Sequence, residues 1–282
     1  MLNKIRRKIA EIQSDIYISQ ALARAAATAS LRDIDETRPE TWEFSGFSQN
    51  GEDGITDFLM NKIIEPNRQF IEIGSSTGID NNTAWLAIAR KFSGLMIEGN
   101  PRASSLSETL LGRINLGVEC HNIFVDKNNI SDLKAMAKSL FPDYFSLDID
   151  GNDYYLMSEI LQSGFRPAVI TVEYNSAFGP DKSLTILYEP GFVIDMHGSQ
   201  YLYYGVSITA WRKFLGSYGY RFVCVDSRGV NGYFLMPDRF DPSFVEALNG
   251  LQFCENFYQM RKYKSSWEQQ FEKIDQREFR EI

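Results

Sequence analysis

The stretch RQFIEIGSSTG, residues 68–78, decides the fold. It begins as an apolar run of strand length that ends at Gly74, and a second glycine follows at Gly78. Glycine lets the backbone turn sharply and lets a ligand come close to the main chain. A helix that begins after such a turn presents its N-terminus to that ligand. The stretch therefore predicts a strand, a ligand-binding turn and a helix, in that order.

The same alternation of apolar runs and helix-length segments continues along the chain. Further strands are predicted at 94–99, 118–125, 144–149 and 168–174, and helices at 81–92, from about 101, and at 131–140, 153–164 and 207–219. This order predicts an α/β fold with a Rossmann-like, doubly wound and mostly parallel sheet. Two later runs, 221–225 and 232–236, flank a short connection and predict a terminal hairpin with one antiparallel edge strand.

The remaining segments predict appendages around one domain of this 282-residue chain. An N-terminal helix over 1–30 carries apolar or small side chains every three or four positions, namely Leu2, Ile5, Ile9, Ile12, Ile16, Ala23 and Ala26. Such a stripe favours packing on its own domain or self-association into a homo-oligomer, and basic residues at 4–8 leave membrane-surface docking as a third interpretation. Residues 31–48 predict a linker, 49–250 the binding domain, and 251–282 a solvated helical tail.

Charge and cysteine content exclude several classes of protein. The formal net charge is −8, from 29 basic against 37 acidic residues, so no global attraction to nucleic acid is expected. The three cysteines form no CxxC or Cys/His cluster, which argues against a disulfide framework and a zinc site. No apolar run has the ~20 residues of a membrane span, and no secretion signal is predicted. We therefore expect a cytoplasmic protein without a transmembrane segment.

An acidic residue, Glu98, ends the second predicted strand. In a doubly wound sheet, a carboxylate at this place accepts hydrogen bonds from both hydroxyls of a ribose. The glycine turn lies one strand–helix–strand unit earlier, so the two features meet at neighbouring strand ends. Together they predict a nucleotide-like ligand. The spacing G-x-G-x-x-G is absent, which disfavours NAD.

The order of these motifs resembles the class I methyltransferases that use S-adenosylmethionine (SAM). That family carries an acidic-x-Gly-x-Gly-x-Gly turn after its first strand; Glu72, Gly74 and Gly78 match it, and Ser76 stands at the middle glycine. The resemblance implies a SAM site with Glu98 on the ribose.

Two further stretches are similar to FkbM-like methyltransferases: SQNGED at 48–53 and IEGNP at 97–101. The likeness covers about residues 48–236. It implies methyl transfer to a hydroxyl of a sugar or glycan acceptor, as in bacterial surface polysaccharide biosynthesis.

A cluster of oxygen ligands follows the fourth and fifth predicted strands. Asp148 and Asp150 alternate along the chain and therefore share one side, and Glu173 and Asn175 end the next strand. Carboxylates in such a group repel one another unless a cation lies between them, and oxygen ligands favour Mg²⁺, Mn²⁺ or Ca²⁺. We expect a divalent metal site here. The alternative is that Asp148 contacts SAM, Asp153 caps a helix and Asp150 is solvated.

Proton removal from the acceptor hydroxyl is assigned to a carboxylate of this cluster, Asp148 or Asp150, or to His197. The segment 176–206 is rich in aromatic residues, which suit a sugar-binding wall or ordinary packing. Two other functions remain open. One is a metal-dependent glycosyltransferase that uses Asp148 and Asp150 as a DxD motif; the other is a non-catalytic scaffold on the same fold.

Overall fold

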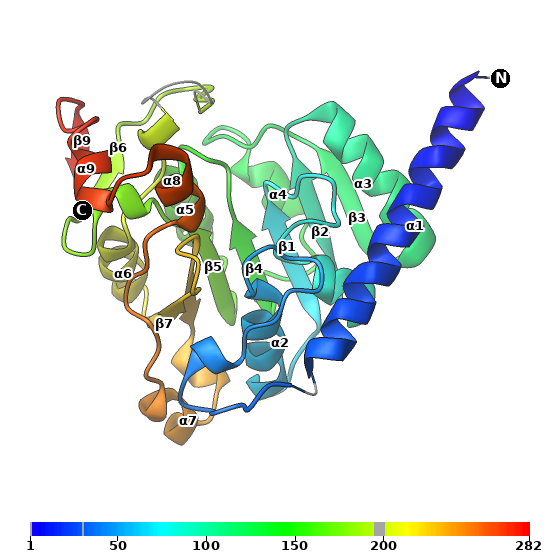
Figure 1. Cartoon of the computed structure of the whole chain (residues 1–282), viewed down its shortest axis with the longest axis horizontal. Helices are drawn as coiled ribbons and strands as arrows, with labels where there is room; N and C mark the ends of the chain where they lie inside the picture. The colour runs from blue at the N-terminus through cyan, green and yellow to red at the C-terminus, as the bar shows by residue number, and fades with distance from the viewer. Residues whose placement is uncertain (1, 30, 195–200) are drawn as a thin grey trace.

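A seven-stranded sheet forms the centre of the computed structural model, which describes residues 2–29, 31–194 and 201–282 (Figure 1). The strands are β1 (Gln69–Ile73), β2 (Ser93–Glu98), β3 (Val118–Asn122), β4 (Tyr144–Leu147), β5 (Val169–Glu173), β7 (Arg221–Val225) and β8 (Asn231–Leu235). Their order is β3-β2-β1-β4-β5-β8-β7, with parallel pairing from β3 to β5. The Rossmann-like, doubly wound sheet is thereby confirmed. The antiparallel strand is β8. It lies between β5 and β7, so the edge of the sheet is formed by β7 and not by the antiparallel strand.

Helices cover both faces of this sheet (Figure 1). They are α1 (Leu2–Ala29), α2 (Glu52–Lys62), α3 (Pro101–Ile114), α4 (Ile130–Met136), α5 (Asp153–Gln162), α6 (Ile208–Ser217), α7 (Pro242–Ala247), α8 (Phe257–Tyr263) and α9 (Trp267–Phe271). Short helical turns are η1 (Pro39–Thr41), η2 (Trp85–Ala89), η3 (Ser176–Phe178) and η5 (Pro237–Arg239).

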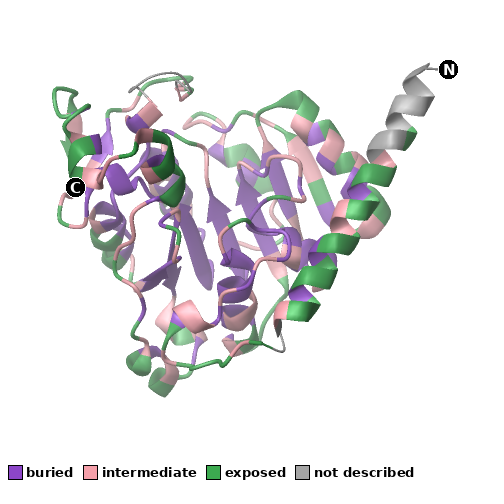
Figure 2. Ribbon diagram, in the orientation of Figure 1, coloured by how far each residue is buried: buried purple, intermediate pink, exposed green. Residues whose placement is uncertain are grey.

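Two hydrophobic cores lie on opposite faces of the sheet because successive strand side chains point to opposite sides. Ile71 packs with α4, α5 and α6, whereas its neighbour Phe70 packs with α2, η2 and α3. Figure 2 shows the central strands buried on both faces. This explains why the parallel strands read as continuous apolar runs in the sequence.

Helix 81–92 was predicted from the sequence, but only η2, a five-residue π-helical segment, forms there. The residues before it make turns, since the Glu72 carboxylate accepts the backbone N–H groups of Asn82 and Thr83. Arg90 then donates to the carbonyl of Trp85, five residues earlier. This part of the prediction is wrong. The backbone N–H groups that would begin a regular helix donate to the buried Glu72 carboxylate of β1, and the residues around them form turns.

The C-terminal tail is not the single solvated helix that its charges predict. It contains α8, α9 and a strand, β9 (Phe279–Glu281), which pairs antiparallel with β6 (Leu184–Ile186). Phe178 of η3 packs edge-on against Phe279, and Ile274 is buried in the same small core. The tail therefore covers the segment that follows β5.

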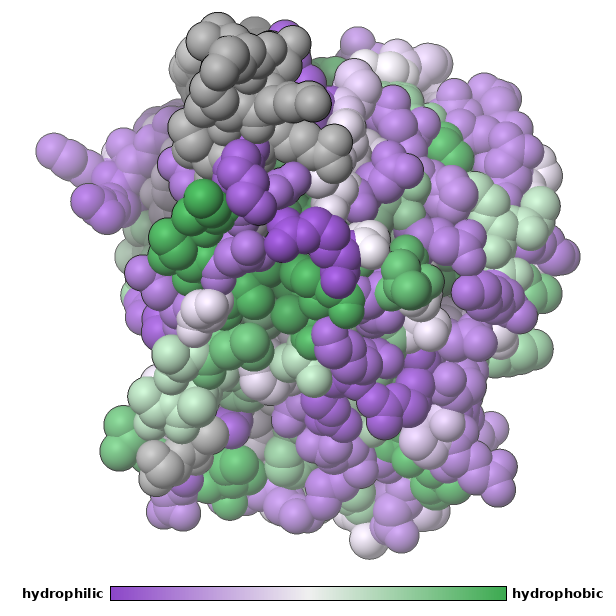
Figure 3. All heavy atoms as spheres, turned by 90° about the vertical axis from the view of Figure 1, so that its right-hand side faces the viewer, coloured by the Kyte–Doolittle hydropathy of each residue, from purple (hydrophilic) through white to green (hydrophobic). Residues whose placement is uncertain are grey.

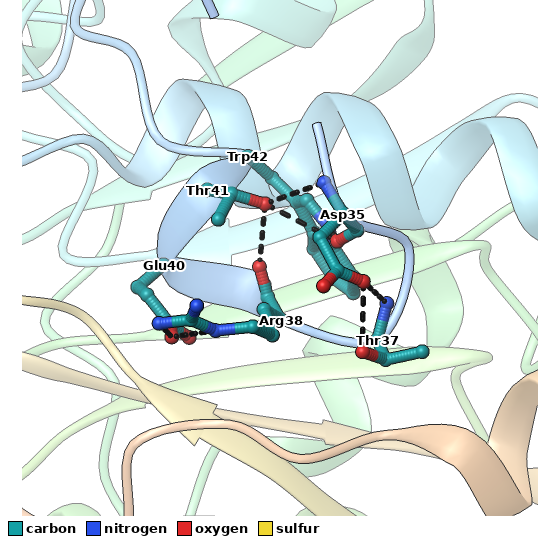
Figure 4. Close-up of polar contacts among 6 residues, drawn as sticks. All are labelled: Asp35, Thr37, Arg38, Glu40, Thr41 and Trp42. Atoms are coloured by element: carbon teal, nitrogen blue, oxygen red, sulfur yellow. Dashed lines mark hydrogen bonds and ion pairs between the residues drawn. The ribbon is translucent and has the colours of Figure 1, made fainter. Parts of the chain in front are cut away.

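The predicted linker 31–48 packs onto the domain. Trp42 is fully buried and stacks on Phe58 at 4.0 Å between ring centroids. Its indole N–H donates to the carbonyl of Asp35, whose carboxylate accepts from both the backbone and the hydroxyl of Thr37 (Figure 4). These bonds order the segment internally, while the stacking of Trp42 on Phe58 and the bond from the Asn249 N–H to the Thr37 carbonyl attach it to the domain.

Helix α1 packs on the domain through one face and leaves another exposed (Figures 1 and 2). Ala21 and Ala25 are buried, whereas Ile12 and Ile16 of the predicted stripe are 49% and 52% exposed. The side chains of Leu2, Ile5 and Ile9 lie outside the described part of the structure. Figure 3 faces the side that carries α1 and shows apolar surface gathered among hydrophilic side chains. No helix among the described residues is long and apolar enough to span a membrane.

Candidate functional site

A cavity of about 640 Å³ opens at the carboxyl ends of the parallel strands. This is where ligands bind in doubly wound sheets, because the order of the strands reverses there. Seven carboxylates line it: Glu52, Glu72, Asp80, Glu98, Asp126, Asp148 and Asp150. Among the described lining residues there is no lysine, arginine or histidine. A nearby cation, Lys127, stacks on the ring of the lining residue Tyr188 at 4.0 Å.

The glycine turn brings the end of β1 against the end of β4. Gly74 has φ of +87°, and a Cβ atom there would lie 1.6 Å from the backbone oxygen of Asp148. Gly78 has φ of +79° and packs against Ser107, so it shapes the turn from behind. Both positions therefore require glycine, for conformation and for space. Gly74 and Ser76 line the cavity; Gly78 is not among the described lining residues.

Glu98 forms the rim of the cavity at the end of β2. One carboxylate oxygen accepts the N–H of Ser76 at 2.8 Å, and the other accepts the N–H of Asn100 at 2.6 Å. Each oxygen retains a second lone pair that can accept a ligand hydroxyl. The structure thus joins Glu98 to the glycine turn, as the sequence predicts.

Glu72 lies at the base of the cavity and is 1% exposed. Its carboxylate accepts the backbone N–H of Asn82 at 3.0 Å and a hydrogen bond from the Thr83 hydroxyl. Burial raises the pKa of Glu72 to about 7, against the lowering effect of these hydrogen bonds. The main role visible in its contacts is to hold the turn that follows Gly78.

Three carboxylates meet at the strand ends beyond the glycine turn. Asp148, Asp150 and Glu173 each place a carboxylate oxygen within 4.8 Å of the others; we call them the acid trio. Removal from water, together with the charges of the neighbouring carboxylates, raises the pKa of Asp148 and of Glu173 well above the ordinary range. A divalent cation with oxygen ligands fits this donor set, because it would offset the repulsion.

Asp153 supports the trio from the first turn of α5. Its carboxylate accepts the N–H groups of Ile149 and Gly151, at 3.0 and 2.8 Å. The chain between them carries Asp150 in the left-handed region, with φ of +54°. Asp153 is therefore a support of the loop, and it is not in the trio.

Behind Glu173, four hydrogen bonds run in one direction and end on its carboxylate. The N–H of Asn256 donates to the Ser176 hydroxyl at 2.9 Å, which donates to the Gln259 oxygen at 3.3 Å. The Gln259 amide nitrogen donates to the Tyr204 hydroxyl at 3.1 Å, which donates to Glu173 at 3.4 Å. We call this the Glu173 relay. It connects the C-terminal tail to the acid trio.

Asn175 has a structural role in place of the predicted one, and His197 cannot be assigned a place. Asn175 is fully buried: its amide nitrogen donates to the carbonyls of Leu202 and Tyr204, and its oxygen accepts the N–H of Ala177. These contacts speak against Asn175 as a metal ligand, because its amide already holds the backbone of the segment after β5. His197 lies outside the described residues.

Sequence reasoning missed the residues that approach the trio from elsewhere in the chain. Tyr204 and Gln259 belong to the aromatic-rich segment and to the tail, and no spacing in the sequence links them. Asn231, on β8, pairs with Glu173 across the sheet and donates to Glu52 at 3.3 Å. The feature of the sequence that could have indicated Asn231 is the predicted hairpin, because it places the start of β8 beside the end of β5.

Comparison with known proteins gives similarity in structure only. No family model matches this chain, and no curated protein matches it. Similar solved structures include an O-methyltransferase from Bacillus cereus in complex with SAH, with 16% identity over 78% of this chain and 89% of that chain and a TM-score of 0.41. Another is the O-methyltransferase TomG from Streptomyces achromogenes in complex with SAM, with 14% identity, 76% and 94% coverage and a TM-score of 0.42. These values do not assign an activity to this chain.

Proposed function

We propose that this protein is a SAM-dependent methyltransferase. The acidic lining of the cavity carries the proposal: seven Asp and Glu side chains line it, and none of the described lining residues is basic. SAM has a positive sulfonium and a net positive charge, whereas the product S-adenosylhomocysteine has lost the sulfonium. An acidic cavity therefore favours the substrate over the product, and Glu98 offers the ribose an acceptor.

The same charge disfavours ligands that contain phosphate. NAD and nucleotide sugars carry negative diphosphates, which such a cavity repels unless a cation intervenes. A metal-dependent glycosyltransferase, with Asp148 and Asp150 as its DxD motif, stays the alternative enzyme. A non-catalytic scaffold would bind none of these ligands.

Calorimetric titration with SAM, S-adenosylhomocysteine and UDP-glucose, with and without Mn²⁺, separates the three functions. We expect SAM to bind without metal, and more tightly than S-adenosylhomocysteine. Binding of UDP-glucose only with Mn²⁺, together with no binding of SAM, would reverse the choice in favour of the glycosyltransferase. No binding of any of them would favour the scaffold.

The acid trio suits activation of an acceptor hydroxyl. In the proposed reaction the hydroxyl oxygen forms a bond to the methyl carbon as the carbon–sulfur bond breaks, and the hydroxyl proton passes to a base. A divalent cation at the trio would lower the pKa of that hydroxyl. Asp148 and Asp150 line the cavity and Glu173 completes the set, so these side chains are the proposed ligands. Asp148, Asp150 or His197 is the proposed base.

A hydroxyl of a sugar or glycan is the proposed acceptor, in keeping with a role in polysaccharide biosynthesis. Tyrosine rings close to the trio support this choice: Tyr201 lies 6.3 Å from Tyr204 and from Tyr258, measured between ring centroids. Aromatic rings with polar ends suit the apolar faces and hydroxyl edges of sugars. We place the reaction in the cytoplasm, since all three cysteines are unpaired.

Self-association through α1 is proposed as well, with a second copy of this chain as the occupant. Ile12 and Ile16 face away from the domain, while Ala21 and Ala25 of the same helix are buried. The predicted stripe therefore does not serve internal packing at these positions. Pairing with the same face of a second copy would bury it.

A further inference from the structure

The acid trio lies between the cofactor cavity and a group of aromatic side chains. Asp148 and Asp150 line the cavity, whereas Glu173 accepts a hydrogen bond from Tyr204 behind it. Tyr201 follows next, 6.3 Å from Tyr204 between ring centroids. Tyr201 is partly buried and is linked to the trio through Tyr204, whose hydroxyl donates to Glu173. A reacting hydroxyl at the trio thus has the cofactor on one side and these rings on the other.

One cation stands over these rings. The Lys262 ammonium lies 3.8 Å from the centroid of Tyr201, 5.4 Å from Tyr263 and 5.8 Å from Tyr258. We call these four residues the tyrosine surface. Lys262 is exposed, and no described carboxylate lies within the 4.0 Å of an ion pair. Next to a site lined with carboxylates, this ammonium is a positive charge that forms no ion pair with any residue of 2–29, 31–194 or 201–282.

The tyrosine surface is attached firmly to the reaction site. Its helix, α8, carries Gln259, which is 1% exposed and donates to Tyr204. Asn256 caps the start of α8 and donates its own N–H to Ser176. The Glu173 relay therefore fixes the distance between Lys262 and the trio through buried hydrogen bonds, which are costly to break.

We propose that the tyrosine surface is the acceptor subsite and that it takes a sugar bearing an anionic substituent, a carboxylate or a phosphate, which Lys262 binds. This inference rests on the proposed methyltransferase function. The sugar ring packs on Tyr258 and Tyr201, and its reacting hydroxyl points to the trio. Tyr201 lies between the anionic group and the carboxylates of the trio, so the two negative charges stay apart.

The test compares two anionic sugars with a neutral one. Ring resonances of labelled tyrosines are followed by NMR during titration of the S-adenosylhomocysteine complex with methyl β-D-glucuronide, glucose 6-phosphate and methyl β-D-glucoside. We expect an anionic sugar to bind about three- to fivefold more tightly than the glucoside, as for one ion pair at a partly exposed site. The carboxylate and phosphate probes show which anion the subsite takes.

Two matched variants locate the charge. Lys262→Gln and Arg261→Gln each remove one positive charge from an exposed position of α8. We expect Lys262→Gln to abolish the preference for anionic sugars and Arg261→Gln to keep it. Tyr258→Ala, at a residue 58% exposed, should weaken all three sugars.

Three results would overturn the inference: no sugar binding, equal affinity for charged and neutral sugars, or a preference that survives Lys262→Gln. Calorimetry with SAM on the same samples keeps the two proposals apart. Normal SAM affinity without an anionic preference removes the acceptor subsite alone. Absence of SAM binding removes the proposed function itself.

Discussion

The cofactor cavity and the tyrosine surface lie on opposite sides of the acid trio, and they are built differently. All seven carboxylates of the cavity lie between Glu52 and Asp150 in the sequence; Glu52 begins α2, and the others lie near the end of a strand or in the segment that follows it. The tyrosine surface joins Tyr201 to α8, which is far away in the chain. The cavity is acidic, whereas the tyrosine surface is aromatic and carries Lys262. This difference indicates that the proposed cofactor site comes from the fold itself and the proposed acceptor site from its additions.

The largest effect is expected at the trio. Asp150→Asn keeps the shape and suits the left-handed backbone at this residue, because asparagine tolerates that region. It removes a charge from the proposed metal site, so we expect turnover to fall by about 10²–10⁴-fold, as on loss of an acid–base or metal function. Chelation with EDTA should have the same effect, while SAM affinity stays largely intact in calorimetry.

The matched control for this variant is Asp132→Asn, at an exposed carboxylate of α4. It should leave turnover unchanged. Full turnover of a metal-free preparation with its true acceptor would contradict the metal hypothesis, and proton removal would then fall to a side chain such as His197.

The second effect concerns the cavity alone. Glu98→Ala removes the rim carboxylate and should cost about 1.5–3 kcal/mol of SAM affinity, as for a hydrogen bond to a charged group. Glu98→Gln, which keeps one acceptor oxygen, should lose less. Glu119→Ala, on the neighbouring strand β3, is the control. If calorimetry finds the same SAM affinity in Glu98→Ala and the control, Glu98 is not part of the site.

A third change acts from the tyrosine side. Tyr204→Phe keeps the ring and removes the hydroxyl that donates to Glu173, so the Glu173 relay ends before its carboxylate. Residues that orient a metal ligand typically contribute 10–100-fold to metal affinity. We expect Mn²⁺ affinity, measured by electron paramagnetic resonance, to fall about tenfold.

The same Tyr204→Phe protein should bind SAM normally, because the tyrosine lies outside the cavity lining. Tyr258→Phe, which removes an exposed hydroxyl from the same aromatic group, is the control and should change neither quantity. Equal Mn²⁺ affinity in both variants would show that the relay has only a structural role.

The smallest effect is expected from α1, which lies outside both regions. Ile12→Glu combined with Ile16→Glu places charges on its exposed face, and we expect the mass from light scattering to fall, roughly twofold for a dimer. Leu116→Glu, at a residue 89% exposed, is the control. A full-length protein that is already monomeric at micromolar concentration would contradict self-association.

The sequence by itself determined the sheet and the acidic cavity at its carboxyl edge, where the cofactor is proposed to bind. Gly74, Glu98 and Asp148 end strands whose apolar runs are readable, and parallel strands bring their carboxyl ends to one edge. Local pattern and topology therefore suffice to place these residues together. The apolar stripe of α1 was also visible in the sequence, but the pattern did not tell which face of this helix packs on the domain.

Only the tertiary structure decided the acceptor side. The charges of the tail predicted a solvated helix, and the helical spacing of Trp267, Phe271 and Ile274 did not tell which part of the chain they would cover. Phe279 finds its partner in Phe178, and Gln259 in Tyr204, through contacts between distant parts of the chain. Similarly, the sequence predicts Asn175 as a metal ligand, whereas in the structure its amide donates to the carbonyls of Leu202 and Tyr204. Side-chain patterns report local periodicity, whereas these contacts depend on where the chain returns after the sheet is complete.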